Sequence, residues 1–492
     1  MKTLLVYPEF PDTFWSFKHA LKFIRKKAAS PPLGLLTVAA LLPEGWEKRL
    51  VDLNVTSLRD EDLRWADYVM IGAMAIQRPS VRQIIERCKA LGRPVVAGGP
   101  LFTAEYEDFE DVDHLVLNEA EITLPRFLSD LGRGKARHLY TTDEFADLRT
   151  TPTPLWELIN LDRYDSVSLQ FSRGCPFNCD FCNVTALFGH RPRTKSAEQI
   201  LTELEALYRL GWRQSVFFVD DNFIGNKAQL KREILPALIE WRKDKRGMPF
   251  NTEVSINLAD DETLVEMMVT AGFDKVFIGI ETPDDASLAE CHKSQNRRRD
   301  LLADVKKLQR AGLRVQGGFI VGFDSDTPSI FKKQIEFIQQ SGIVTAMVGL
   351  LQAPPGTPLY RRLKEEGRLL GKMMGDNVSL ATNILPKMGL ETLKEGYRTI
   401  MKNIYTPQHY YERVKTFLRE YEAPRIKAPL QIHHIHAFLR SIYELGIVGE
   451  ERRYYWDLLL WTLFRRPTLF PLAVTLAIYG YHFHNVCQMH IF

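Results

Sequence analysis

The sequence predicts an α/β protein with two successive series of alternating strands and helices, followed by a helical C-terminal region. Short β-prone runs alternate with amphipathic stretches over residues 1–130 and again from about residue 166. This alternation is typical of parallel sheets covered by helices. The chain has 492 residues, 45% of them hydrophobic and 25% charged. It is therefore long enough for two or three ordinary globular domains.

The first series predicts a doubly wound, Rossmann-like sheet. Its five β-prone runs cover residues 3–7, 49–53, 68–73, 94–97 and 114–117. Such sheets bind cofactors in the crevice beyond the carboxyl ends of their strands. Gly98 and Gly99 directly follow the fourth run, where missing side chains would let a ligand approach the backbone. An ordinary turn between strand and helix is the alternative interpretation of this pair.

The second series begins after a predicted linker at residues 131–165, where Pro152 and Pro154 disfavour regular structure. Its candidate strands cover residues 166–171, 215–219, 252–256, 275–280, 314–321 and 345–350. Six strand–helix units are too few for a closed eight-fold barrel. Active sites of such folds lie at the carboxyl ends of the strands, so we expect the functional residues there.

Three cysteines carry the strongest chemical signal in the chain. Cys175, Cys179 and Cys182 have CxxxCxxC spacing in the stretch FSRGCPFNCDFCNV, just after an apolar run. Three thiolates in one loop can hold a corner of an iron–sulfur cube. One iron then stays open for a chelating amine and carboxylate, such as the methionine end of S-adenosylmethionine (SAM). A structural zinc site, which normally needs four ligands, and three incidental cysteines are the alternatives.

The triplet, with Phe181 before its last cysteine, resembles the radical SAM superfamily. The wider sequence resembles its cobalamin-dependent branch, and within it the hopanoid C-2 methylase family. The matching phrases are LQFSRGCPFNCDFCN, VFFVDDNFIGN, VFIGIETP, GGFIVGFDSDT and LLQAPPGTPLY. The resemblance covers nearly the whole chain. It implies a cobalamin-binding domain at 1–130, a partial (β/α)6 radical SAM barrel at 166–365 and a helical domain at 366–492.

The resemblance also implies which residues bind the cofactors. Cys175, Cys179 and Cys182 would hold a catalytic 4Fe-4S cluster. Asp220, Asp221 and Asn222 would contact the amino group of SAM, although they depart from the superfamily's common Gly-Gly-Glu. Helix capping is the alternative role for these three. The other positions assigned to SAM are Glu253, Ser255, Glu281 and Thr282 near the ribose and methionine carboxylate, Gly317, Gly318 and Gly322 near the adenine, and Gln352 in the pocket wall.

For cobalamin, the informative feature is a missing motif. Many corrinoid domains carry Asp-x-His-x-x-Gly, whose histidine binds cobalt, and this chain lacks it. Either no cobalamin binds, or it binds without a protein histidine on cobalt, which the resemblance favours. Gln77 is then a candidate for the lower side of the corrin, with an ordinary loop residue as the alternative. Glu119 and Glu121, after the fifth run, are candidates for lining the nucleotide tail.

The resemblance implies a cobalamin-dependent radical C-methyltransferase. One SAM would methylate the corrinoid, and another would be cleaved at the cluster to a radical that removes hydrogen from an unactivated carbon. A low-potential donor such as flavodoxin or ferredoxin would supply electrons. A polycyclic lipid is the favoured substrate, ahead of a tetrapyrrole or a protein side chain. A non-methylating rearrangement or cyclisation, and a non-catalytic corrinoid or redox sensor, are the alternative functions.

Charge and hydropathy limit the cellular setting. A net charge of +3 gives no reason to expect nucleic acid as a partner. Clustered and scattered cysteines without a disulfide pattern suit the cytoplasm. The apolar stretches at 456–464 and 469–481 are too short to span a bilayer. They would shape an apolar substrate site, pack in the core, or make peripheral contact with the inner membrane.

Overall fold

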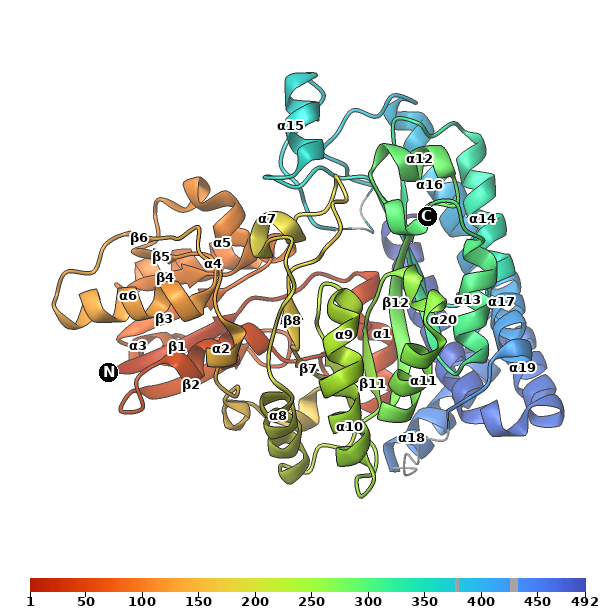
Figure 1. Ribbon diagram of the computed structural model, residues 1–492, viewed down its shortest axis with the longest axis horizontal. Coiled ribbons are helices and arrows are strands. Elements are labelled where there is room, and N and C mark those ends of the chain that lie inside the picture. The colour runs from red at the N-terminus through yellow and green to blue at the C-terminus, as the bar shows by residue number, and fades with distance from the viewer. Residues whose placement is uncertain (377, 379, 425–431) are drawn as a thin grey trace.

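The computed structural model describes residues 1–376, 378, 380–424 and 432–492. Two six-stranded parallel sheets and a group of C-terminal helices make up this part of the chain (Figure 1). The α/β fold class is therefore confirmed. The two series of strands form separate sheets, each in the part of the sequence where its alternation was predicted.

The N-terminal sheet has the order β2-β1-β3-β4-β5-β6 and is covered on both faces. Helices α2 and α6 pack on one face, and helices α3, α4 and α5 on the other. This is the doubly wound arrangement that the sequence predicted. The strands are β1 (Lys2–Tyr7), β2 (Glu47–Asp52), β3 (Tyr68–Gly72), β4 (Val95–Gly98), β5 (His114–Val116) and β6 (Leu139–Tyr140). The helices are α2 (Leu33–Leu41), α3 (Asp60–Trp65), α4 (Arg78–Ala90), α5 (Pro100–Glu105) and α6 (Ala120–Gly132).

Strand β6 lies within the segment that the sequence predicted to be a linker. It pairs in parallel with β5 through Leu115–Leu139 and Val116–Tyr140. A strand of two residues is too short to show alternation in the sequence. Its position is fixed instead by long-range pairing with β5 and by burial of Tyr140.

The second sheet has the order β14-β13-β12-β11-β10-β7, with each strand beside its neighbour in sequence. This is the partial six-stranded barrel. Its strands are β7 (Ser166–Leu169), β10 (Ser215–Phe218), β11 (Phe250–Glu253), β12 (Phe273–Glu281), β13 (Arg314–Val321) and β14 (Ala346–Leu350). The helices along it are α8 (Ala197–Arg209), α10 (Leu235–Arg242), α11 (Glu262–Ala271), α12 (Asp285–Glu290), α13 (Leu301–Arg310) and α14 (Ser329–Ser341).

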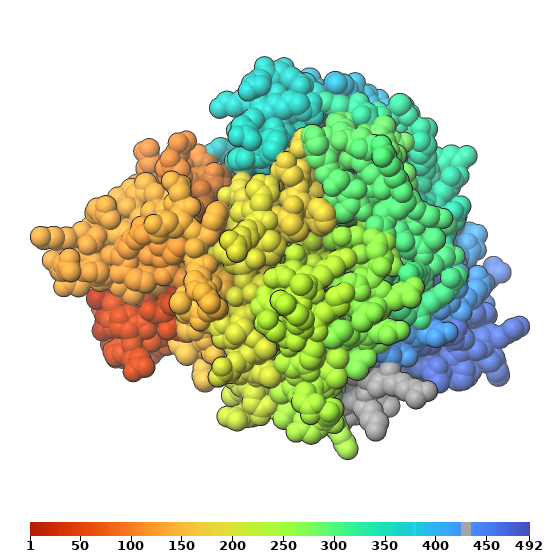
Figure 2. Space-filling model, in the orientation of Figure 1, coloured from red at the N-terminus to blue at the C-terminus, as the bar shows by residue number. Residues whose placement is uncertain are grey.

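Contacts between the N-terminal part and the barrel join the two sheets. In Figure 2 the orange surface of the N-terminal part abuts the yellow surface of the first barrel segments. A second bridge comes from the segment after α15 (Pro358–Glu365). Arg78 of α4 donates to the Met373 carbonyl oxygen at 3.3 Å, and Lys372 pairs with Asp108.

The C-terminal helices pack beside the last barrel strand. They are α16 (Leu390–Tyr405), α17 (Pro407–Glu420), α18 (Ile432–Ser441), the π-helix η12 (Ile442–Val448), α19 (Arg452–Arg465) and α20 (Phe470–His490). The Tyr405 hydroxyl donates to the carbonyl oxygen of Ala346 at 2.6 Å, which anchors α16 to β14. Among the helices described, none combines the length and hydropathy needed to cross a membrane.

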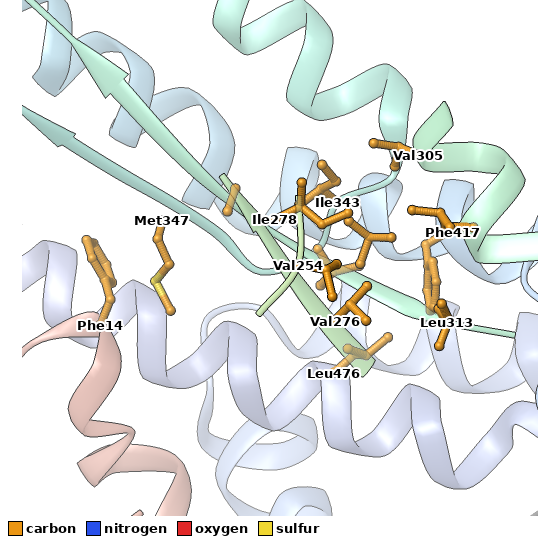
Figure 3. Close-up of a cluster of buried hydrophobic side chains, with 14 of the residues drawn as sticks. Phe14, Val254, Val276, Ile278, Val305, Leu313, Ile343, Met347, Phe417 and Leu476 are labelled. Carbon is orange, nitrogen blue, oxygen red and sulfur yellow. The ribbon is translucent and has the colours of Figure 1, made fainter. Parts of the chain in front are cut away.

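A segment between β1 and α2 leaves the N-terminal sheet and joins the barrel side of the molecule. It contains η1 (Phe14–Ser16), α1 (Lys18–Leu21) and η2 (Lys22–Ile24). Phe14 is fully buried, its ring 5.8 Å from those of Tyr405 and Phe483, and lies beside Met347 of β14 (Figure 3). We call residues 13–24 the N-terminal insertion.

Candidate active site

The polar residues that were assigned to SAM from sequence lie along one edge of the barrel sheet. Glu253 and Glu281 are the last residues of β11 and β12. Asp220 follows β10, Gly322 follows β13 and Gln352 follows β14, each within two residues. Because neighbouring strands are parallel, their carboxyl ends meet at this edge. The strand order therefore brings together residues that are far apart in the sequence.

The cysteine triplet lies in a loop closed by a short antiparallel ladder at the same edge. Strands β8 (Ser172–Arg173) and β9 (Arg193–Thr194) pair at its base, and we call residues 174–192 the cysteine loop. Gly174 has a φ of 95°. A Cβ atom there would lie 3.0 Å from the carbonyl oxygens of three residues at the returning end of the loop. Glycine is thus required where the loop begins, one residue before Cys175.

Further contacts hold the middle of the cysteine loop. The amide of Asp180 donates to the Cys291 carbonyl oxygen at 3.1 Å, at the end of α12. The Asp180 carboxylate lies 2.8 Å from His292 Nδ1. Its carbonyl oxygen accepts from the amide of Leu359, in α15, at 3.1 Å. The loop is therefore fixed by the barrel and not by the cysteines alone.

The donor set of the loop fits a 4Fe-4S cluster. All three cysteines are free, and burial raises the pKa of the Cys182 thiol to about 12. Gln295 Nε2 lies 3.8 Å from Cys179 Sγ. Within the described ranges, no group of three His, Cys, Asp or Glu side chains is placed to hold a single metal ion. A cluster has a different requirement, because each thiolate ligates its own iron.

Lys293 supplies the positive charge of the site, and sequence reasoning missed it. Its ammonium lies 2.7 Å from Glu281 Oε1. Burial disfavours this charge, but Glu281 and the thiols of Cys179 and Cys182 hold the pKa of Lys293 above its usual value. A buried cation beside three thiolates offsets the negative charge of a thiolate-bound cluster. Lys293 follows a short helix in a loop, so no local pattern identified it.

Two of the acidic residues after β10 hold the chain that leads into the cysteine loop. Asp220 accepts from the Phe171 amide at 3.2 Å, the Ser172 hydroxyl at 2.6 Å and the Ser172 amide. Asp221 accepts from the Gly174 amide at 2.9 Å. Burial raises the pKa of Asp220 to about 7, although these hydrogen bonds act to lower it. Their polar contacts in this structure are therefore to the polypeptide.

Glu253 differs from the other carboxylates at this edge. No hydrogen bond or ion pair reaches its side chain from the described residues. Burial, together with the nearby charges of Asp221 and Asp220, raises its pKa to about 7. By contrast, Glu281 is paired with Lys293 and has a φ of 62° at an irregularity in the pairing of β12 with β13. Glu253 is therefore the carboxylate available to a cationic ligand.

The remaining assigned residues have protein partners or tight packing. Asn222 Nδ2 donates to Ser255 Oγ at 3.2 Å, and Thr282 Oγ1 accepts from the Asp284 amide at 3.2 Å. A Cβ on Gly318 would lie 2.8 Å from the Phe277 ring, and one on Gly317 equally close to that of Phe319. Packing alone thus requires these glycines. Gln352 donates to the Asp376 carbonyl oxygen at 2.8 Å.

The candidate cobalamin residues lie at the carboxyl edge of the N-terminal sheet. Gln77 is buried and donates to the Pro8 carbonyl oxygen at 2.6 Å. A Cβ on Gly98 would lie 2.6 Å from the Val116 carbonyl oxygen, and Gly99 has a φ of 90°. Close packing at Gly98 and the positive φ at Gly99 therefore account for the two glycines without a ligand. His114 begins β5, at the opposite edge of the sheet from these candidates.

Glu119 has partners that sequence reasoning did not anticipate. Both of its carboxylate oxygens accept from Arg193, each at 2.8 Å. Arg173 pairs with Glu119 at 3.2 Å and with Glu121 at 2.8 Å. The two arginines belong to β8 and β9, so Glu119 is bound to the base of the cysteine loop. Only long-range folding brings these four residues together.

We expect the cysteine loop to be the site of the cluster. Replacing Cys175, Cys179 and Cys182 together by alanine should abolish the broad visible absorption at about 400 nm that thiolate-ligated clusters give. Iron analysis after anaerobic reconstitution checks this, with Cys88→Ala as a matched control far from the loop. Full iron content in the triple variant would contradict the assignment.

Family models match three parts of the chain. The B12 binding domain matches residues 26–128, the radical SAM superfamily residues 169–338, and a domain of unknown function, DUF4070, residues 357–491. The fold also resembles the solved cobalamin-dependent SAM radical enzyme OxsB with aqua-cobalamin bound. That match has a TM-score of 0.63 and 15% identity, over 99% of this chain and 80% of the other.

Two relatives are similar over almost their whole length. An uncharacterised methyltransferase of Synechocystis is 41% identical, covering 98% of this chain and 91% of the relative. The hopanoid C-2 methylase of Rhodopseudomonas palustris is 34% identical, covering 94% and 90%. The matched domains imply SAM, a 4Fe-4S cluster and cobalamin as cofactors. The chain belongs to the cobalamin-dependent radical SAM methyltransferases, in the family of the hopanoid C-2 methylase.

Proposed function

We propose that the enzyme methylates an unactivated carbon of a polycyclic lipid. The observation that carries this proposal is an aromatic pair on the inner side of the barrel. Trp15 of the N-terminal insertion is 45% exposed, and its ring lies 5.2 Å from that of Phe277 on β12. Phe277 is on the same face of β12 as Gly279, because side chains alternate along a strand. A Cβ on Gly279 would meet the Glu281 carboxylate, so Glu281 faces this side too. An apolar wall with few polar groups suits a lipid.

The cofactors define what the protein has to supply. When bound, the reduced cluster cleaves SAM and cobalamin carries the methyl group, whereas the protein provides binding and orientation. We infer that Cys175, Cys179 and Cys182 hold the cluster, and that a low-potential donor such as flavodoxin or ferredoxin reduces it. The N-terminal part, with Gln77, Gly98 and Gly99 at its carboxyl edge, would hold cobalamin.

We further propose that Glu253 binds the positively charged end of SAM. Its unpaired carboxylate and raised pKa support this role, because a cationic ligand relieves the cost of a buried negative charge. Asp220 and Asp221 would not contact SAM directly. They would fix the backbone that leads to Cys175. The glycines of β13 and Gln352 would form the remaining wall. In this proposal SAM would lie between the cysteine loop and the inner face of β12.

We expect Trp15→Ala to separate substrate methylation from SAM cleavage. Removing about 2 kcal/mol of apolar contact should lower kcat/KM for methylation about 30-fold. Cleavage of SAM without substrate should remain, because the ring of Trp15 packs on Phe277 of β12, which is not part of the cysteine loop. Anaerobic assays on lipid extracts, with mass spectrometry of the product and of 5′-deoxyadenosine, give both rates. Trp65→Ala, in the N-terminal domain beside Arg49, is the matched control.

The same assay tests the reaction type. A product heavier by one methylene unit supports methylation, whereas a product of unchanged mass would identify a rearrangement or cyclisation. Equal loss of methylation and SAM cleavage in folded Trp15→Ala protein would contradict a substrate contact at this position.

We also propose that the C-terminal helices contact an anionic membrane surface. Ile435, Leu439, Tyr443 and Ile447 lie four residues apart on α18 and η12, and all four are exposed. On α19, the exposed apolar residues are Trp456, Leu460, Leu463 and Phe464, the last at 79%. Trp456 Nε1 donates to the Gly446 carbonyl oxygen at 2.9 Å, which joins the two helical segments.

Charge on the same helices favours a lipid partner of negative charge. Four exposed arginines on α18, η12 and α19 outnumber the two acidic residues there, Glu444 and Asp457. The arginines are Arg440, Arg452, Arg453 and Arg465. Aromatic and aliphatic residues flanked by arginine are typical of helices that lie in the membrane interface. A polycyclic lipid substrate would also be taken from such a surface.

We expect the Leu439→Glu, Phe464→Glu double variant to bind membranes more weakly. Each charge placed in the headgroup region should oppose insertion, and partitioning should fall at least about tenfold. Flotation with phosphatidylglycerol–phosphatidylcholine vesicles measures it, and Leu210→Glu, at an exposed position after α8, is the control. Unchanged flotation of the double variant would contradict the proposal. A dimer that becomes a monomer in the variant would identify the surface as an interface between copies.

A further inference from the structure

The base of the cysteine loop carries two arginines directly opposite each other. Arg173 of β8 and Arg193 of β9 are partners in the antiparallel pairing. Like charges at opposed positions destabilise a strand pair. The pair therefore needs negative charge from elsewhere, and within β8 and β9 there is none.

That charge comes from the cobalamin-binding domain. Glu119 and Glu121 lie at the beginning of α6, directly after β5. Arg193 binds both oxygens of Glu119 at 2.8 Å. Arg173 binds Glu121 through two bonds, of 2.8 and 3.1 Å. We call these four residues the interdomain clamp.

The clamp is buried and its hydrogen bonds are extensive. The side chains of Glu119 and Glu121 are only 2% and 4% exposed. The amide of Ala146 donates to Glu119 at 2.5 Å, and the Thr151 hydroxyl donates to Glu121 at 2.8 Å. Two carboxylates balance two guanidinium groups. A balanced, bidentate and buried arrangement fixes geometry more strictly than a surface ion pair does.

The clamp residues are close in sequence to the expected sites of both cofactors. Arg173 lies two residues before Cys175, and Arg193 directly follows the loop's last residue. On the other side, Glu119 follows the carboxyl end of β5, the edge at which doubly wound sheets bind ligands. The same four side chains thus connect the cluster-bearing loop to the cofactor edge of the other domain.

We propose that the interdomain clamp is a positioning device that sets the cysteine loop against the cobalamin-binding domain. Methyl transfer requires the groups held by both domains in register, whereas SAM cleavage requires only those held by the barrel. The clamp residues are positioning residues, since the contacts found for them are with each other and with neighbouring protein groups such as the Thr151 hydroxyl. The inference rests on the family's cofactors and not on the identity of the substrate.

The test uses Glu121→Gln, which keeps the shape of the side chain and removes the charge that Arg173 binds. Amide hydrogen exchange of residues 174–192, measured before and after reconstitution, should quicken by at least about tenfold when the buried pair is broken. Methylated product per SAM cleaved should fall by a similar factor, with iron content and SAM cleavage retained. Glu144→Gln removes an exposed partner of Arg126 and should change neither quantity.

Three results would overturn the proposal. One is unchanged exchange of the cysteine loop together with an unchanged ratio of product to cleavage. Another is equal loss of methylation and cleavage, which would mark the clamp as a purely structural contact. The third is loss of bound cobalamin with unchanged loop exchange, which would assign the carboxylates to that cofactor.

A second variant covers the case in which Glu121→Gln does not fold. Arg193→Lys retains the charge but cannot make two parallel bonds to Glu119. It should show the same loss of coupling in a folded protein. If Arg193→Lys matches the wild type in exchange and coupling, the positioning role is refuted. A failed wild-type substrate assay alone would count against the proposed lipid, because the exchange measurement needs no substrate.

Discussion

The arrangement of this enzyme depends on the meeting of two carboxyl edges, one from each parallel sheet. Parallel sheets gather their loops and polar residues at those edges. Glu119 follows β5 and Arg173 follows β7, and the two are paired in a buried contact. A buried pair of this kind is costly to break, because separation leaves an uncompensated charge. The contact therefore keeps the carboxyl edge of the N-terminal sheet close to the carboxyl edge of the barrel sheet.

At the carboxyl edge of the barrel sheet, acidic side chains outnumber the cationic side chains bonded to them. Asp220, Asp221, Glu253 and Glu281 lie there, with Lys293 as the cation bonded to one of them. Burial raises the pKa of both Asp220 and Glu253 to about 7. Backbone amides and the Ser172 hydroxyl satisfy Asp220, whereas no group in the described part of the chain pairs with Glu253. A site with this imbalance favours a positively charged ligand over a neutral one, which is the charge that SAM brings.

Much of the fold could be predicted from the sequence because its strands follow local patterns of β-prone residues and its cluster cysteines follow a local spacing. Eleven of the strands in the two sheets fall on the predicted runs, and all cluster cysteines share one loop. The partners of these residues could not be predicted. Arg193 is positioned by pairing with Glu119, and Lys293 and β6 by contacts outside their own elements, none of which leaves a periodic trace in the sequence. For the same reason, Glu119 was assigned to a cofactor although it binds arginines.

The N-terminal insertion connects the cobalamin-binding sheet covalently to the aromatic pair on the barrel. It leaves the cobalamin-binding sheet after β1, packs Phe14 against Tyr405 and Phe483, and returns at α2. His482 of α20 lies 3.1 Å from the Phe14 carbonyl oxygen. Trp15, the next residue, is therefore anchored on the barrel side of the molecule, where its ring lies 5.2 Å from that of Phe277. Because the same segment is joined to β1 at one end and to α2 at the other, the packing of Phe14 opposes a shift of the cobalamin-binding domain relative to the aromatic pair.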